Sequence, residues 1–264
     1  MEKLEVFGGH KLKGEVKISG SKNSSLPILA ATLLSNKKVI LKNIPNVDDI
    51  STMISLLASF GSKIKEDKKN NSVEINNNKI NKMLAAYSLV KTMRAGILVL
   101  GPLLARYRKA TVSLPGGCNI GARPIDLHLK ALTQLGMSYK IINGYVYAKA
   151  PNGLIGNSIV FKKISVGATQ NLIIAASMAK GVSNISNCSI EPEVKDLVNF
   201  LNKIGCKIKW VGKRKVKIIG VKKFNELSYS VMFDRIEAGT FAIAAACSES
   251  NLRITNINRH NQYL

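Results

Sequence analysis

The chain has 264 residues and a net charge of +23, from 39 Lys or Arg against 16 Asp or Glu, and 46% of its residues are apolar. This composition is typical of a globular protein with one or two cored domains and excludes a disordered chain. Residues 1–5 lack the apolar core of a signal peptide, and no run of about 18 uncharged apolar residues occurs. We therefore expect a cytoplasmic protein with no membrane partner.

The surplus of basic residues raises the alternative of a nucleic-acid binder, because such a field attracts polyanions. The Lys residues are scattered among Asn, Ile and acidic residues, and only 6% of the residues are aromatic, which leaves few platforms for base stacking. The densest basic stretch, 207–217, alternates as a hairpin with one solvated face. We expect no nucleic-acid partner, although the charge would favour anionic substrates.

The four cysteines, Cys118, Cys188, Cys206 and Cys247, lie far apart and form no C-x-x-C pair. This spacing argues against a zinc site, and a reducing cytosol argues against disulfides. Cys188, Cys206 and Cys247 are interpreted as small buried hydrophobic residues at strand or helix positions. We expect neither a metal ion nor a cofactor.

In chain order, the apolar pattern predicts two kinds of helix separated by short strands. One kind is apolar on all sides, which indicates burial, and the other is amphipathic and half exposed. The predicted elements are an apolar helix at 26–34, a strand at 38–41, an amphipathic helix at 48–60 and strands at 63–66 and 73–75; an apolar helix at 89–105, a strand at 111–114, an amphipathic helix at 124–135 and strands at 139–142 and 145–148; and a strand at 159–162, an apolar helix at 168–179, an amphipathic helix at 192–204 and strands at 207–210 and 216–219.

Each amphipathic helix ends in the same pattern. Leu57-x-x-Phe60-Gly61-x-x-Ile64 returns at 132–139 and again at 201–208. A glycine that ends a helix just before a strand is a helix C-cap signature. The chain therefore contains three units of about 70 residues, which predicts an α/β fold with buried helices surrounded by sheets.

A fourth unit begins near the C-terminus. Residues 234–247 resemble the opening of the third unit, and Ile254-Thr-Asn256 matches Ile185-Ser-Asn187, but no amphipathic helix or hairpin follows. We expect one complete domain at 22–230 and a fragment of a second, similar domain at 1–21 plus 231–264. Such a fragment could not bury its apolar faces alone.

Residues 114–124, LPGGCNIGARP, form the segment most suggestive of chemistry. Its glycines allow the backbone to bend closely around a ligand. Cys118 in an electropositive loop can be ionised and reactive, and Arg123 offers the fork of donors that suits phosphate or carboxylate. For this pattern alone, a plain turn with a stray thiol remains an alternative.

This loop, the Gly-Ser-Lys22-Asn23 segment and the segment Lys163-Ile-Ser-Val-Gly-Ala-Thr169 together resemble the UDP-N-acetylglucosamine enolpyruvyl transferases, and the likeness is collinear from Met1 to about Asn256. The resemblance implies an inside-out α/β barrel of three pseudo-symmetric units around a helical core. It also implies transfer of an enolpyruvyl group from phosphoenolpyruvate to the 3-hydroxyl of UDP-N-acetylglucosamine, the first committed step of peptidoglycan synthesis.

The resemblance also implies a set of site residues. Cys118 would be the general acid, and Arg123 would bind the phosphate. Lys22 would hold phosphoenolpyruvate beside Asn23, and Arg94 would contact the nucleotide-sugar. The nucleotide end would be lined by Pro124, Ile125, Asp126 and Leu127, and the diphosphate and ribose would be contacted by Lys163, Ile164, Ser165 and Val166.

Structural roles remain open for some of these residues. The segment with Lys22 can be an ordinary turn in which Asn23 caps a helix. Arg94, placed on an otherwise buried helix, can form a structural ion pair. His128 is interpreted as a surface or half-buried helix residue rather than an acid or base.

The chain departs from the resembled family in one respect. Family members carry a second complete domain, and the resemblance places a base-type aspartate and three arginines of that domain beyond residue 264. Two alternatives to an active transferase are therefore kept: an inactive truncated remnant, and an N-terminal part that requires a separately encoded C-terminal half as its partner.

Overall fold

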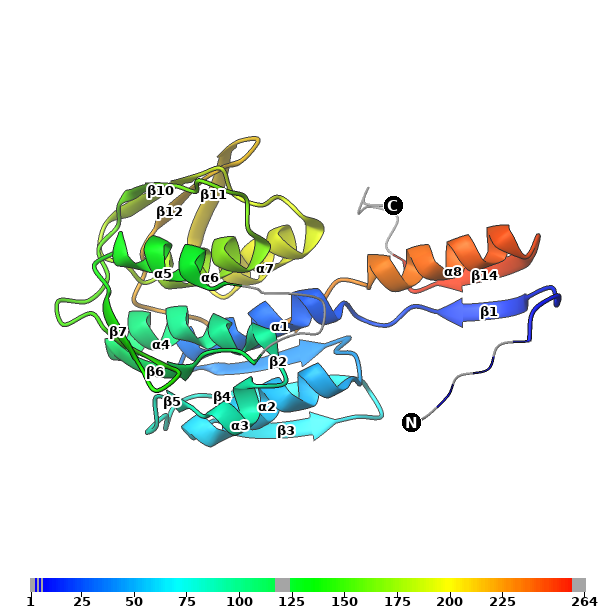
Figure 1. The fold of residues 1–264 in the computed structure, drawn as a ribbon, viewed down its shortest axis with the longest axis horizontal. Coiled ribbons are helices and arrows are strands. Elements are labelled where there is room, and N and C mark those ends of the chain that lie inside the picture. Colours follow the sequence, from blue (N-terminus) through cyan, green and yellow to red (C-terminus); the bar gives the residue numbers. More distant parts are fainter. Residues whose placement is uncertain (1–2, 4, 6, 117–123, 258–264) are drawn as a thin grey trace.

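The computed structural model describes residues 3, 5, 7–116 and 124–257. These residues form a body of three helix-and-sheet units and an arm that projects from one end of the body (Figure 1). The first unit is built from a buried helix, a strand, a second helix and a hairpin. Its elements are α1 (Lys22–Ala31), the 3-10 helix η1 (Thr32–Leu34), β2 (Lys38–Lys42), α2 (Asp48–Phe60), β3 (Lys63–Asp67) and β4 (Ser72–Asn76).

The second and third units repeat this plan. The second contains β5 (Leu84–Ala85), α3 (Tyr87–Val90), η2 (Arg94–Val99), α4 (Leu100–Tyr107), β6 (Lys109–Ser113), α5 (Asp126–Thr133), β7 (Ser138–Ile142) and β8 (Tyr145–Lys149). The third contains β9 (Ser158–Val160), α6 (Val166–Ala176), β10 (Val182–Ser186), α7 (Pro192–Lys203), β11 (Lys207–Gly212) and β12 (Lys215–Ile219).

The glycine of each repeat has the backbone conformation that the sequence pattern predicts. Gly61, Gly136 and Gly205 have φ angles of 106°, 97° and 118°, in the left-handed region that favours glycine. A strand follows each of them and pairs antiparallel within its own unit. The three-unit prediction is therefore confirmed at the points where it was made.

Each of the three outer sheets also contains one parallel pair of strands. β5 pairs with β6, β9 pairs with β10, and β13 (Leu227–Ser230), which follows the third unit, pairs with β2 of the first. The sheet orders are β13-β2-β4-β3, β5-β6-β8-β7 and β11-β12-β10-β9. The chain thus returns to its first unit after completing the third.

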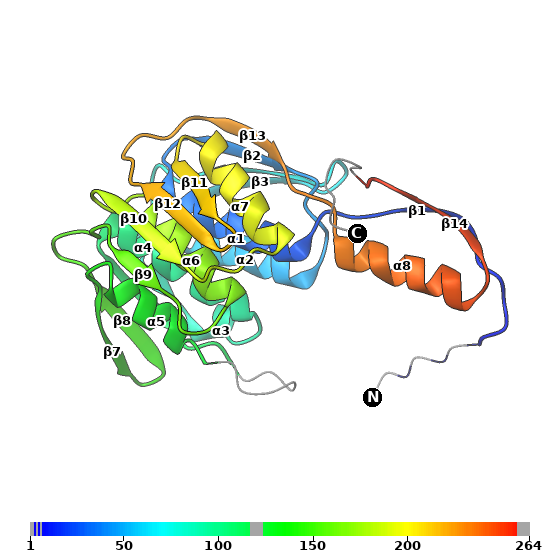
Figure 2. The same cartoon turned by 90° about the horizontal axis from the view of Figure 1, so that it is seen from above.

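The centre of the body is helical and the sheets lie outside it (Figure 2). Residues 24–31 of α1 and 168–176 of α6 are all buried. Ser25 donates to the carbonyl of Ser21 and Ser177 to that of Ile173, whereas Ser24 donates to Asp196 of α7, so these buried hydroxyls are hydrogen-bonded. This arrangement confirms the expected inside-out α/β fold.

Two predictions about the elements need correction. The helix expected at 89–105 is interrupted. Three shorter elements, α3, η2 and α4, take its place, and Pro102 lies near the start of α4. The short strands β5, β10 and β13 were not predicted. They are completed by pairing with strands distant in sequence, which a local pattern does not reveal.

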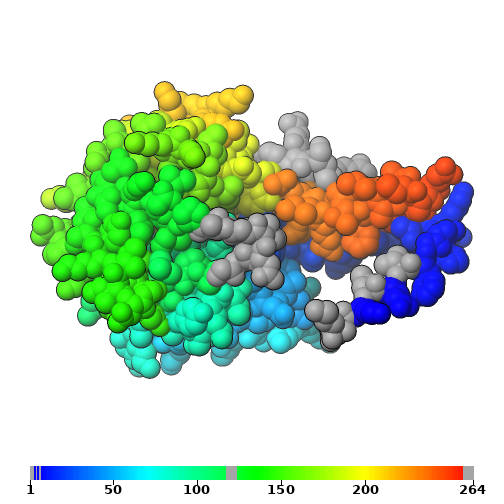
Figure 3. All heavy atoms as spheres, in the orientation of Figure 1, coloured from blue at the N-terminus to red at the C-terminus, as the bar shows by residue number. Residues whose placement is uncertain are grey.

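The arm consists of β1 (Lys13–Lys17), α8 (Arg235–Cys247) and β14 (Asn251–Thr255), with β1 parallel to β14. It has its own small apolar cluster around Ile18, Phe233 and Ala238. Only Ala238 of α8 is buried, and most of the side of α8 that faces the viewer in Figure 3 is uncovered. We propose that 22–230 is one domain and that 1–21 plus 231–264 belongs to a second.

The arm also corrects the interpretation of the cysteines. Cys247 is exposed, because nothing described covers the end of α8. Cys188 and Cys206 are buried as predicted, but they lie in loops beside β10 and β11 and not on a strand or helix. Burial raises the pKa of both buried thiols to about 12. Among the described residues, no helix is long and apolar enough to cross a membrane.

Candidate substrate-binding site at the helix starts

Lys22 begins α1 and lies between two carboxylates. Its Nζ is 2.9 Å from Oδ2 of Asp49 in α2, and its backbone N–H donates to Oδ2 of Asp234 at 3.3 Å. Ser21 caps the helix by accepting from the N–H of Ser24. The structural alternative that gave this cap to Asn23 is therefore wrong, and Asn23 is exposed beside Lys22.

A second group of contacts joins the starts of η2, α5 and α6. The charge of Arg94, the first residue of η2, acts on His128 in the first turn of α5. A Cβ placed on Gly167, in the first turn of α6, would lie 3.3 Å from Nε2 of His128. Three of the predicted segments, which contain Arg94, Asp126 and Val166, therefore come together here.

Two sequence interpretations at this point are wrong. Arg94 is exposed at a helix start rather than enclosed in a helix, because the predicted helix is interrupted just before it. His128 is 4% exposed rather than on the surface, because α5 packs its first turn against α6. Burial, with the positive charge of Arg94 second, lowers the pKa of His128 to about 4, against a raising effect from Asp126.

The remaining predicted residues flank these helix starts. Pro124 is exposed, Ile125 is buried, and Asp126 and Leu127 are half-buried, with Asp126 paired to Lys130 at 3.3 Å. Lys163, Ile164 and Val166 are exposed, and Ser165 caps α6 by accepting from the N–H of Ala168. Residues 163–166 therefore lie at the surface, just before and at the capped start of α6.

Cys118 and Arg123 lie outside the described residues, so their predicted roles remain proposals. The residues on either side are placed. Gly116 packs so closely against the carbonyl of Lys91 that a Cβ there would lie 2.3 Å from its oxygen. Pro124 precedes α5, whose first turn carries His128. Both ends of the predicted loop therefore attach near the start of η2 and α5.

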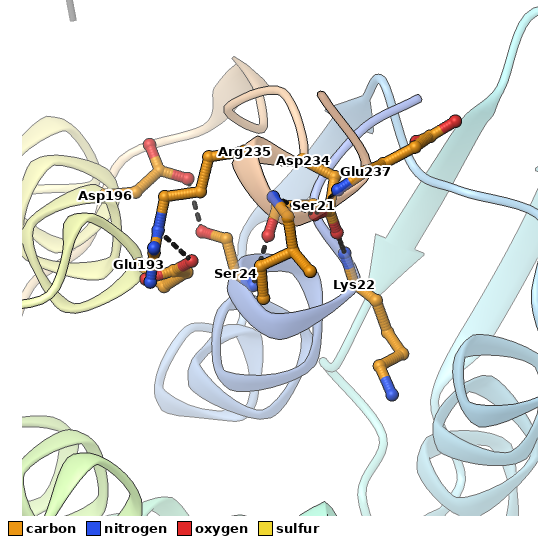
Figure 4. Close-up of polar contacts among 9 residues, drawn as sticks. Ser21, Lys22, Ser24, Glu193, Asp196, Asp234, Arg235 and Glu237 are labelled. Carbon is orange, nitrogen blue, oxygen red and sulfur yellow. Dashed lines mark hydrogen bonds and ion pairs between the residues drawn. The ribbon is translucent and has the colours of Figure 1, made fainter. Parts of the chain in front are cut away.

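A third group of contacts fixes the base of the arm on the body (Figure 4). Arg235, at the start of α8, donates through Nε to Glu193 Oε1 at 2.9 Å and through Nη2 to Oε2 at 3.3 Å. Asp196 accepts from Ser24 Oγ at 2.5 Å, from Tyr229 Oη at 2.5 Å and from the N–H of Met232 at 3.3 Å. The starts of α1, α7 and α8 are therefore held together.

Sequence reasoning missed the acidic members of this group. Asp49, Glu193 and Asp234 occupy the first turns of α2 and α7 and the cap of α8, where acidic residues are expected for purely local reasons, and Asp196 lies one turn further into α7. Asp234 caps α8 through Oδ1 and reaches Lys22 through Oδ2, which is a contact between residues 212 positions apart. In the sequence, only the occurrence of an acidic residue at or near several predicted helix starts could have suggested them.

The clustered helix starts can bind anions. The first N–H groups of a helix lack partners within it, and the helix dipole favours negative charge there. Lys22, Arg94 and Lys163 add positive side chains beside these starts. Among the described residues, no group of three His, Cys, Asp or Glu side chains is arranged to hold a metal ion. The site as described therefore fits phosphate-bearing or carboxylate-bearing molecules.

The sequence profile of the EPSP synthase (3-phosphoshikimate 1-carboxyvinyltransferase) family matches residues 6–263. The chain belongs to this family. It is 67% identical over 258 residues to the UDP-N-acetylglucosamine 1-carboxyvinyltransferase of Pelagibacter ubique (strain HTCC1062), which covers 98% of this chain and 61% of that protein. It is 50% identical over 259 residues to the enzyme of the same name from Helicobacter pylori (strain ATCC 700392 / 26695), with 97% and 61% covered.

Solved structures agree with the enolpyruvyl transferase fold. The enolpyruvyl transferase NikO from Streptomyces tendae superposes with a TM-score of 0.84 at 20% identity, over 94% of this chain and 58% of that one. EPSP synthase from Acinetobacter baumannii gives 0.78 at 17% identity, over 96% and 57%. These likenesses show the fold. In each comparison the chain spans about 60% of the length of its relative.

Proposed function

We propose that this chain carries the substrate-binding helix starts of a UDP-N-acetylglucosamine 1-carboxyvinyltransferase, which transfers an enolpyruvyl group from phosphoenolpyruvate to the sugar 3-hydroxyl. The observation that carries the proposal is the 67% identity to a curated protein of that name across 98% of the chain. On this proposal the protein works in the cytoplasm, in peptidoglycan synthesis and hence in cell-wall formation.

The proposed chemistry needs cations and an acid. The sugar hydroxyl gives its proton to a base, which the resemblance places beyond residue 264, as its oxygen bonds to carbon two of phosphoenolpyruvate and carbon three gains a proton from the acid. Carbon three then loses a proton as the bond from carbon two to the phosphate oxygen breaks and inorganic phosphate leaves. Both substrates are anionic, so Lys22 and Arg123 would hold phosphoenolpyruvate and Arg94 and Lys163 the nucleotide-sugar. Cys118 would deliver the proton to carbon three.

Alkylation of the thiols tests this assignment. An epoxide phosphonate of the fosfomycin type resembles phosphoenolpyruvate and reacts with a thiolate, so we expect it to label Cys118 fastest, and faster still with UDP-N-acetylglucosamine present. Mass spectrometry of tryptic peptides gives the site. Cys247 is an exposed thiol and Cys188 and Cys206 are buried ones, so the chain contains its own controls. Equal labelling of Cys118 and Cys247 would contradict the proposal.

A second candidate is that the chain functions only together with the part of the family's length that it does not span. The uncovered side of α8 favours this, because Ile236 and Ile243 are 52% and 66% exposed on a helix otherwise like the buried α6. On this proposal the partner is a separately encoded C-terminal half, and the chain alone is inactive.

Co-expression tests this candidate. We expect the chain to co-purify with the segment of the Pelagibacter ubique protein that follows its matched region, and to form product only then. Ile243→Lys should abolish co-purification, whereas Ile141→Lys, at an isoleucine 50% exposed on β7, should not. Product formation by the chain alone would contradict this candidate. Failure of every combination to form product would favour the inactive remnant.

A further inference from the structure

Asn171 of α6 fills the interruption between η2 and α4. In a continuous α-helix the carbonyl of Ile97 would accept from the N–H of Gly101, four residues later. Here the Asn171 amide takes both places, because Oδ1 accepts from the Gly101 N–H at 2.9 Å and Nδ2 donates to the Ile97 carbonyl at 3.1 Å. A Cβ on Gly101 would lie 2.3 Å from Asn171 Oδ1, so a glycine is needed opposite the amide.

These two bonds settle the orientation of the amide. The Gly101 N–H can only donate, so the atom facing it must be the oxygen of Asn171. The nitrogen then has two hydrogens, of which one goes to Ile97. The other points to Nδ1 of His128, 3.1 Å away. Nδ1 must therefore be the accepting nitrogen of the ring, and the ring proton is on Nε2.

The opposite edge of the ring faces the helix starts. A Cβ on Gly167 would lie 3.2 Å from Cε1 and 3.3 Å from Nε2 of His128, so this edge lies against the first turn of α6. The charged groups that act on the ring are Arg94, which opposes a positive charge on it, and Asp126, which favours one. Burial and Arg94 prevail, and the pKa of His128 is lowered to about 4, so the ring is neutral at physiological pH.

We propose that Asn171 is a positioning residue that holds His128 as its neutral Nε2–H tautomer and so makes the ring an uncharged hydrogen-bond donor between the starts of α5 and α6. The next step rests on the proposed function: the oxygen that accepts this hydrogen bond belongs to the diphosphate or ribose of the nucleotide-sugar. His128 then contributes neither a proton nor a charge to the reaction. Its hydrogen bond is the same across the physiological pH range.

The tautomer can be observed directly in the intact chain. Two-bond proton–nitrogen correlation spectra of histidine-labelled protein separate a protonated from a bare ring nitrogen. We expect wild-type His128 to show a bare Nδ1 and a protonated Nε2 at neutral pH. In Asn171→Asp the carboxylate cannot donate, so Nδ1 should become protonated and the pKa of His128 should rise. Titration with UDP-N-acetylglucosamine should show binding weakened about tenfold.

Asn202→Asp is the matched control. Asn202 also bridges a backbone N–H and a carbonyl, both of Ile208 at 2.9 Å, but at the far end of α7. It should lose its bridge without changing the His128 spectrum or binding. A protonated Nδ1 in wild type, or an unchanged spectrum in Asn171→Asp, would overturn the proposal. A tautomer change in a chain whose wild type binds no nucleotide-sugar would support the role of Asn171 and contradict the proposed function.

Discussion

Lys22 is held in place by an ion pair that is open to solvent. Its side chain is 42% exposed and that of its partner Asp49 is 33% exposed, so the 2.9 Å ion pair is screened by solvent and worth at most about 1 kcal/mol. The ammonium group therefore stays available to an anion. A residue positioned in this way should matter more to binding than to stability.

We predict that Lys22→Gln slows alkylation of Cys118 by the anionic epoxide about tenfold, because one cationic partner of the reagent is lost. The free energy of unfolding should change by less than about 1 kcal/mol. Stopped-time mass spectrometry gives the rate, and urea denaturation gives the stability. Lys140→Gln, at an exposed lysine on β7, is the control and should leave the rate unaltered. Equal rates in both variants would show that Lys22 does not meet the reagent.

Asp196 gives a prediction with a defined pH direction. Burial raises the pKa of this carboxyl above its ordinary value of 3.8, against the lowering effect of hydrogen bonds from Ser24 and Tyr229. The folded state therefore binds this proton more tightly than the unfolded state does. The stability it contributes is fully present below pH 3.8 and is lost as the pH rises through the raised pKa.

The difference in unfolding free energy between wild type and Asp196→Asn should therefore fall as the pH rises above 3.8. Asp67 is the control with the opposite sign. Hydrogen bonds from Asn70 lower its pKa, so its contribution is present above 3.8 and is lost as the pH falls through the lowered value. Urea denaturation at a series of pH values measures both. If the free-energy difference changed with pH in the same direction for Asp196→Asn and for Asp67→Asn, the assignment of opposite pKa shifts to the two carboxyls would be refuted.

At the residue scale, the sequence revealed the types of side chain in the site better than their surroundings. Lys22 and Ser165 lie at helix starts, and the family resemblance, not the local pattern, singled them out. His128 and Arg94 were placed wrongly, because their exposure depends on how α5 and η2 pack against α6. Asp49 and Asp234 were missed because each is also an ordinary first-turn or capping residue.

At the element scale, the attachment of α8 to α7 depends on one partly buried ion pair. The Glu193 side chain is 5% exposed and that of Arg235 is 32% exposed. We predict that Arg235→Gln costs about 3 kcal/mol, because the Glu193 carboxylate is left buried without its partner. Hydrogen exchange should accelerate across α8 and β14 more than in α1.

Arg253→Gln provides the comparison within the arm. Arg253 pairs with Glu15 at 3.5 Å, but the two side chains are 79% and 53% exposed. Removing this pair should cost less than about 1 kcal/mol and leave the exchange of α8 unchanged. If both arginine variants lost the same stability, the attachment of the arm would not depend on the Glu193–Arg235 contact.

The elements that the sequence predicted well are those with a local signal. The pattern that ends in Gly61 predicted the limits of α2 because amphipathic spacing and a left-handed cap coincide there. The strand β13 has no such signal, since its partner β2 lies almost 190 residues earlier, for example Leu227 opposite Val39. The interruption at η2 depends on Asn171 from another unit, which no local pattern contains.

At the scale of the whole molecule, the three repeats predicted buried helices with sheets outside them, but closure of the ring came from the resemblance. In the structure the ring is closed where β13 pairs with β2, and the two segments of chain that lead to the arm lie side by side. Ser21 donates its N–H to Met232 at 2.8 Å and Asp234 donates to Ser19 at 2.9 Å. These connections lie beside Lys22, so the arm and the candidate site share one end of the body.

The most direct test of the account is a titration of the intact chain with UDP-N-acetylglucosamine, followed by calorimetry and by amide spectra. We expect saturable binding, with the largest shifts at the starts of η2, α5 and α6, around Arg94, Asp126 and Gly167, and with competition from UDP but not from inorganic phosphate at the same concentration. Shifts confined to the lysine-rich hairpin of β11 and β12, or no saturable binding, would contradict the account.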